Sequence, residues 1–289
     1  MFNNRIFLAA IVTSICTMSV QARETITVIN PSNKASPATV FAKSYEDALK
    51  KDSRFNVEFY QASSCADGDE KYRKTKNAVM VFNADVAIAA RDKGVPCDFY
   101  STAANTSLIT KSYLKFCRKS GSNKEFGRDR TTLGIASVIL SDGLMRDLNG
   151  GVQRKLVGVP YSGSKTILSA LLAGDIDYGI LGAGVVNSPE AAGVIECVYD
   201  YNPAAKNFIA KTFPSLKVPT LPIIQMIHTN ATTAEVNGAI AKSVQDTEFL
   251  NSIKKNGFED TKNAGITASD VNSVKSHIEN VYGHYWKKP

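Results

Sequence analysis

Hydroxyl and amide side chains gather directly after apolar runs at several points in this sequence. Such side chains donate and accept hydrogen bonds, so they can hold the oxygens of a small anion. The first three clusters follow predicted strands at 25–29, 55–60 and 78–82. The candidate ligand-binding residues in these clusters are Ser32, Asn33, Ser36, Ser63, Ser64, Asn83 and Ala84.

A catalytic centre is not indicated by the remaining polar residues. The three histidines, His228, His277 and His284, all lie in the last quarter of the chain and none adjoins a serine nucleophile motif. The metalloprotease, phosphate-loop and dinucleotide-binding motifs are absent. Asp175 and Asp177 form a carboxylate pair, but a pair at the start of a strand is more often solvated or capping. We therefore expect no enzyme activity, no cofactor and no metal site.

Alternating strands and helices must position the first clusters. A helix is predicted from Pro37 onward, because Ser36 suits a helix N-cap and proline suits the first helical position. A charged segment after Gly68 is predicted as a second helix, before the strand at 78–82. Strands that alternate with helices indicate a parallel sheet, and ligands bind at the carboxyl ends of such strands.

The stretch from Leu156 to Ala183 predicts a second unit of the same kind. An apolar run at 156–159 is followed by a turn at 161–164, where Ser162 or Ser164 would cap the next helix. That helix would bury leucines and isoleucine at 167–172, and a strand would follow at 175–181. The helix N-terminus would present free N–H groups to a ligand beside Tyr161 and Ser164.

Two stretches resemble the solute receptors of tripartite tricarboxylate transporters, which are periplasmic binding proteins. One carries Val159-Pro160-Tyr161, Gly163, Ala170-Leu171-Leu172, Gly174 and Ile176-Asp177, and the other runs from 212 to 221. The remaining segments follow in the family's order over most of the chain. The first loop departs from the family, because it reads Asn33-Lys34-Ala35-Ser36 where paired glycines and an acidic residue are usual. The second loop lacks the usual Arg-Pro-Gly run.

The resemblance implies a two-lobed α/β fold in which each lobe is a mostly parallel sheet flanked by helices, with two crossing hinge segments. Residues 23–103 and 222–289 would form lobe 1, and residues 104–221 would form lobe 2. It also implies that Ser137 and Ser141 contact the ligand, with Ser141 as the N-cap of a helix that follows the strand at 132–136.

The function implied by the resemblance is capture of a small organic anion, first of all a carboxylate, for a membrane transporter by a monomeric protein. A phosphate or phosphonate receptor of an ABC transporter is an alternative. An orphan signalling receptor and an exported enzyme are further alternatives from different classes.

The first 22 residues have the pattern of a signal peptide, with cleavage expected after Ala22 and a periplasmic location. The apolar run is shorter than the roughly 20 residues that a membrane span needs. Loss of Arg5 would take the net charge from +7 to +6 (7 − 1). The basic residues are spread along the chain, so we expect no nucleic-acid partner.

Four cysteines remain after the leader, and their spacing contains no CxxC motif of a zinc or redox site. An even number in an exported chain favours disulfides, and four cysteines allow three pairings. A bridge between the lobes would resist hinge motion, so we expect one bridge within each predicted lobe. The predicted pairs are Cys65–Cys97 and Cys117–Cys197.

Overall fold

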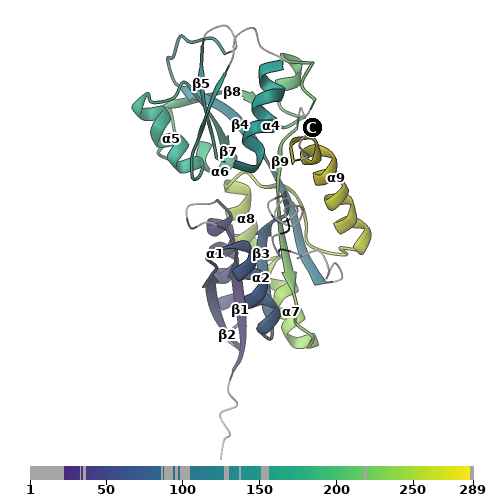
Figure 1. Cartoon of the computed structure of the whole chain (residues 1–289). Coiled ribbons are helices and arrows are strands. Elements are labelled where there is room, and N and C mark those ends of the chain that lie inside the picture. The colour runs from purple at the N-terminus through teal and green to yellow at the C-terminus, as the bar shows by residue number, and fades with distance from the viewer. Residues whose placement is uncertain are drawn as a thin grey trace, which may run out of the picture.

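The computed structural model describes residues 23–32, 34, 37–85, 87, 94, 97, 105–126, 130–136, 138–150, 156–217 and 220–286. The predicted signal peptide lies outside these residues. The described chain forms two α/β lobes joined by long strands (Figure 1). No helix within these ranges is long and apolar enough to span a membrane.

The first lobe is built on β1 (Glu24–Asn30), β2 (Phe55–Gln61) and β3 (Ala78–Asn83), which are parallel in the order β2-β1-β3. The last five residues of β1 are buried, because the strand is flanked by two others and covered by helices. The helices α1 (Pro37–Lys50) and α2 (Cys65–Lys74) follow β1 and β2. The apolar side of α1 packs against α7 (Ala234–Ser243) and α8 (Thr247–Lys255).

The strand β4 (Thr106–Lys119) belongs to both lobes. Its residues from Thr106 to Tyr113 pair with β9 (Pro222–Thr229), and those from Leu114 to Arg118 pair with β7 (Tyr178–Gly182). The hydrogen-bonded ladder therefore runs continuously from one lobe into the other through β4. Since β9 returns to pair with β3, β4 and β9 are the two crossing strands (Figure 1).

The second lobe is built on β5 (Thr132–Ile135), β6 (Val157–Pro160) and β7, which are parallel, and on β8 (Ile195–Asp200), which is antiparallel to β4. All five residues of β7 are buried beneath α5 (Ser164–Ala173). Gly179 lets α5 approach, because a Cβ there would overlap the Ile167 side chain. The helices α4 (Val138–Gly150) and α6 (Ala183–Val186) follow β5 and β7.

The C-terminal part of the chain completes both lobes. The short strand β10 (Glu259–Lys262) pairs with β4 at the edge of the first lobe. The long helix α9 (Ala268–Trp286) packs beside α4 of the second lobe, with Val271 and Ile278 buried in a core that also contains Leu144 and Leu148 (Figure 1).

The fold class predicted from the sequence is confirmed, while several element boundaries differ. Helix α4 begins at Val138, so Ser141 lies inside the helix and the predicted N-cap at this residue is wrong. Helix α2 begins at Cys65, which shortens the second loop to 62–64. Asp175 and Asp177 precede β7 rather than forming its first residues. Two separate helices, α7 and α8, follow β9. The lobe boundaries at 103/104 and 221/222 stay predictions.

Disulfides join Cys65 to Cys97 and Cys117 to Cys197, the pairing expected from the sequence. The Cα atoms of the first pair are 5.8 Å apart. Cys117 and Cys197 lie directly opposite each other in the β4–β8 ladder, so the second bridge stays within the second lobe.

Candidate ligand-binding site

The parallel strands of the two lobes end facing each other. Strand β9 is antiparallel to both β3 and β4, so β4 runs in the same direction as β1, β2 and β3. Strand β7 is antiparallel to β4, and β5 and β6 are parallel to β7. The carboxyl ends of β1–β3 therefore point toward the second lobe, and those of β5–β7 point toward the first (Figure 1).

The register of the crossing strands gives the spacing between these two edges. Asn83 lies opposite Gln225 of β9, and Gln225 lies opposite Thr110 of β4. Gly182, the last residue of β7, lies opposite Leu114 of β4. Thr110 and Leu114 are four residues apart (114 − 110), or about 13 Å along a strand. Both polar edges thus surround one region at the middle of β4.

An amide network holds the first-lobe edge at the ends of β1 and β2. The buried Asn30 Nδ2 donates to Thr39 Oγ1 at 2.8 Å and to Gln61 Oε1 at 3.0 Å. The Asn30 Oδ1 accepts from the Ser32 N–H at 3.2 Å, and Gln61 Nε2 donates to the Ser32 carbonyl at 2.6 Å. These bonds fix the turn that leads toward α1. Sequence reasoning missed Asn30 and Gln61, although each is the polar residue that ends a strand.

Ser63 and Ser64 at the end of β2 are engaged with the start of α2. Ser64 is the N-cap, and its Oγ accepts from the Asp67 N–H at 3.1 Å. The Ser63 N–H and hydroxyl donate to Asp67 Oδ2 at 2.7 and 2.9 Å. These bonds from Ser63, together with one from the Tyr60 hydroxyl, lower the pKa of Asp67. Both serine side chains thus stabilise the helix start, and both remain exposed.

The end of β3 carries Asn83 and Ala84. The Gln225 amide donates to Asn83 Oδ1, and Ala84 is buried in the first turn that follows. Gln225 itself is only 1% exposed, and its Oε1 has no hydrogen-bond partner among the residues that the structure describes. A buried amide oxygen without a partner destabilises the protein, so Gln225 is a further polar residue of interest at this edge.

The second-lobe edge is formed at the N-termini of α4, α5 and α6. The N-cap of α5 is Gly163 rather than Ser162 or Ser164. Ser164 is the first helical residue, and its buried Oγ accepts from the Gly182 N–H at 3.3 Å. This bond ties the start of α5 to the end of β7. Tyr161 is half-buried, and its ring lies beside Gly134, where a Cβ would stand 3.3 Å from Cε2.

Helices that begin at the facing edges differ from the other helices in whether they carry an acidic residue in the first turn. Helices α1, α4, α5 and α6 begin at the facing edges and have no acidic residue in the first turn. Helices α7, α8 and α9 begin elsewhere and carry Glu235, Glu248 and Asp270 there. Helix α2 carries Asp67 in its first turn, but the carboxylate of Asp67 already accepts hydrogen bonds from Ser63 and Tyr60. Free N–H groups and the helix dipole favour an anion at the facing edges.

The structure places part of the predicted site at these edges. Ser32, Ser63, Ser64, Asn83, Ala84, Tyr161 and Ser164 all lie at the carboxyl ends of strands or at helix starts beside them. Asn33, Ser36 and Ser137 lie outside the described residues, as does the side chain of Ser141. Contact of any of these residues with a ligand stays a prediction.

Asp177 and His228, two titratable residues named in the sequence analysis, each have a partner in the structure. Asp177 pairs with Lys124 at 2.6 Å and accepts from the Thr132 N–H at 2.9 Å. Burial alone would raise the pKa of Asp177, but these partners lower it. His228 is fully buried, with Nδ1 2.7 Å from Thr106 Oγ1. Within the described ranges no cluster of histidine, cysteine and acidic side chains suits a metal ion.

The comparisons with known proteins agree with this geometry. No protein-family model and no curated protein matches the sequence. Among solved structures, MatC from Rhodopseudomonas palustris with bound malate superposes with a TM-score of 0.67, at 14% identity over 91% of this chain and 99% of that one. R. palustris Rpa4515 with adipate gives a TM-score of 0.63, at 14% identity over 92% and 96%.

A TctC solute-binding protein from Polaromonas gives a TM-score of 0.60, at 14% identity over 91% of this chain and 99% of that one. The fold is thus that of the two-lobed periplasmic binding proteins. Within that class, the chain shares the fold of the TctC-type solute-binding proteins.

Proposed function

We propose that this chain is a periplasmic solute-binding protein that closes its two lobes around a small organic carboxylate. The supporting observation is that the helices that begin at the two facing strand edges, other than α2, have no acidic residue in the first turn. Backbone N–H groups there would hold carboxylate oxygens from both sides, with hydroxyl and amide side chains beside them. The bound malate of MatC and the bound adipate of Rpa4515 support the choice of carboxylate.

Binding would couple to movement about the crossing strands. β4 belongs to both lobes and the chain returns to the first lobe at the start of β9, so a change in the angle between the lobes requires bending at these two crossings. A closed, loaded protein would then deliver the solute to the subunits of a membrane transporter. In this proposal the mature protein begins after Ala22, works in the periplasm as a monomer, and performs no catalysis.

A thermal-unfolding screen tests the proposal. Malate, adipate and other dicarboxylates are compared with phosphate, phosphonates and amino acids at equal concentrations. A bound carboxylate should stabilise the folded protein by about 2.7 kcal/mol at one hundred times its dissociation constant. Stabilisation by phosphate or a phosphonate alone would favour an ABC-type receptor instead. A protein that responds to no compound would contradict solute binding.

A further inference from the structure

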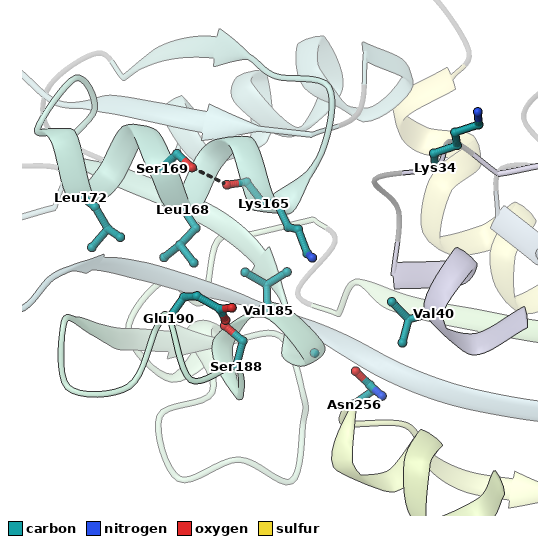
Figure 2. Close-up of a pocket in the computed structure, with 11 residues that line it drawn as sticks. Lys34, Val40, Lys165, Leu168, Ser169, Leu172, Val185, Ser188, Glu190 and Asn256 are labelled. Atoms are coloured by element: carbon teal, nitrogen blue, oxygen red, sulfur yellow. Dashed lines mark hydrogen bonds between the residues drawn. The ribbon is translucent and has the colours of Figure 1, made fainter. Parts of the chain in front are cut away.

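The seam between the two lobes is hollow beside α5 and bridged by the chain beside α9. On the α5 side it holds a cavity of about 480 Å³, whose walls include Val40 of α1 and Lys165 of α5 (Figure 2). Helix α9 lies on the opposite side of β4 and β9 from α5, and it runs from beside the first lobe toward α4 (Figure 1). The C-terminal part of the chain therefore connects the lobes in addition to the two crossing strands.

The first-lobe end of this connection is β10. This strand pairs with β4 at Ile109 and Lys111, in the part of β4 that also pairs with β9. Directly after β10, the Asn263 Nδ2 donates to the carbonyl of Val244, the C-cap of α7, at 3.1 Å. The chain is thus held to the first lobe as far as Asn263.

The second-lobe end of the connection is α9 itself. Among the described helices and strands, α4 is the one against which α9 packs most extensively. Val271 and Ile278 lie two turns apart on one side of α9, and they are buried in a core with Leu144 and Leu148 of α4. Separation of α9 from α4 would expose these side chains to water, which favours movement of the two helices together.

Helix α9 also lies near the crossing strand β4. Partial desolvation and the neighbouring Lys111 lower the pKa of His277. Lys111 is three residues before Leu114, where β4 begins to pair with β7 (114 − 111). A contact so close to the crossing can persist while the lobes rotate, because atoms near a hinge move little.

The linker between the two anchored ends is short and contains no helix or strand. Asp270 Oδ2 accepts hydrogen bonds from the Thr267 N–H and hydroxyl at 2.7 and 2.8 Å, which fixes the start of α9. Residues 264–266 remain between Asn263 and Thr267. Gly265 among them has φ +59° and open space around it, so its backbone can rotate without a clash.

An ion pair also bridges this linker. Lys262 Nζ lies 2.7 Å from Asp270 Oδ1, and the two side chains are 44% and 28% exposed. Partly exposed ion pairs contribute little to stability, because water and salt screen the charges. The pair can therefore form and break as the linker changes shape.

We propose that α9 moves with the second lobe and that residues 263–267 form a third crossing, a tether that limits the separation of the lobes. This assignment differs from the sequence-based boundaries, which put residues 222–289 in lobe 1. Two adjacent strands alone permit twisting as well as bending, whereas a tether displaced from them restricts both. A fully extended tether spans about 14 Å between the Cα atoms of its ends, so it sets the widest opening of the cleft.

Distances between pairs of spin labels in the solute-free protein test which lobe carries α9. The labels are attached to Lys242→Cys of α7, Ala173→Cys of α5 and Ser276→Cys of α9, which replace exposed residues. The native cysteines of the described chain are disulfide-bonded and do not take the label. The α9–α5 distance distribution should be narrow, and the α9–α7 distribution should be as broad as the α5–α7 one.

Two outcomes of this measurement would overturn the proposal. A narrow α9–α7 distribution beside a broad α9–α5 distribution would place α9 with the first lobe. Three equally narrow distributions would show that the lobes do not move relative to each other. No solute is present, so the result is independent of whether the protein binds a carboxylate.

A longer linker tests the tether directly. Two glycines inserted after Gly265 add about 7 Å of reach, and the α5–α7 distribution should extend to longer distances by up to that amount. The same insertion after Gly193 is the matched control. Gly193 also has positive φ and open space, but it lies between α6 and β8 within the second lobe. An unchanged distribution after the first insertion, or an equal extension after both, would contradict a tether at 263–267.

Discussion

At the scale of single residues, the polar side chains at the strand ends divide by what they contact. Asn30, Ser64 and Asp67 hold turns and helix starts through bonds to their own neighbours. Ser162, by contrast, is exposed immediately before the N-cap of α5. It therefore offers a place to change the charge at the second-lobe edge without disturbing the core.

Ser162→Asp should lower carboxylate affinity at least tenfold, because a fixed anion would compete for the α5 N-terminus. The unfolding free energy should change by no more than about 1 kcal/mol. Thr232→Asp places the same charge at the same position before α7, away from the facing edges, and should leave affinity unchanged. Calorimetry with malate or the best ligand of the screen measures both. Similar affinity in both variants would contradict an anion site at α5.

His228 gives a prediction about pH. Burial lowers its pKa from 6.5 to about 4, so between these values the unfolded chain binds more protons than the folded one. Stability that is present above pH 6.5 should therefore fall as the pH drops toward 4, by about 3 kcal/mol from this group. His228→Gln should flatten the pH dependence measured by urea unfolding, while His277→Gln, which alters an exposed histidine, should flatten it less. Parallel curves for all three proteins would contradict this.

At the scale of elements, the end of α8 touches the start of α6 across the lobe seam. Gly257 adopts φ +78°, and a Cβ there would overlap the Cβ of Ala183. Gly184 lies similarly close to Asn256, with 3.1 Å from an added Cβ to Oδ1. The Asn187 Nδ2 also donates to the Lys255 carbonyl at 3.4 Å. Small residues thus allow the two lobes to meet at this point.

Gly257→Ala should destabilise the protein by about 2–3 kcal/mol, because a left-handed alanine is strained and its methyl group would push the lobes apart. Gly265→Ala is the matched control, since Gly265 has φ +59° but open space around it. It should cost about 1 kcal/mol from strain alone. Urea unfolding compares the two variants. Equal losses would show that the contact with Ala183 does not matter.

The Cys117–Cys197 bridge closes a loop with a sequence separation of 80 residues. In the chain-entropy model its loss should lower the unfolding free energy by about 4 kcal/mol. Because both cysteines lie in the second lobe, Cys117→Ser with Cys197→Ser should still bind the solute at low temperature. Thermal unfolding and ligand titration of the double variant measure the two effects. Loss of binding in a folded variant would contradict a purely structural role.

The sequence predicts these elements better than their ends. The apolar runs and the proline at 37 mark β1, β3 and α1 correctly, because burial and the fixed φ of proline act locally. The start of α4 at Val138 was missed, since serine is a good N-cap residue and Ser141 therefore looked like the start of the helix. Asp177 precedes β7 because Lys124 and Thr132 hold it, and these partners lie 53 and 45 residues away (177 − 124; 177 − 132). Such partners are set by the fold rather than by local sequence.

At the scale of the whole molecule, the site depends on strand direction. The sequence predicts strand ends bearing polar residues, but it does not show that the two sets face each other. That relation follows from β4 running antiparallel to both β9 and β7. A cavity between the lobes that Val40 of α1 and Lys165 of α5 both line could not be predicted either, because these two residues come from separate lobes. The order of the predicted strands and helices along the chain supported a two-lobed architecture, but it did not support any finer detail.

The pairing of β3 with β9 also has a consequence for how the chain folds. Asn83 and Gln225 are 142 residues apart, and strands β5 to β8 of the second lobe lie between them. As the chain is made, the second lobe can complete its ladder while β3 still lacks β9 on one side. Non-local pairing of this kind is slow, and until it forms the unpaired apolar edge of β3 can associate with other chains. The first part of the protein to be synthesised is thus among the last to be protected.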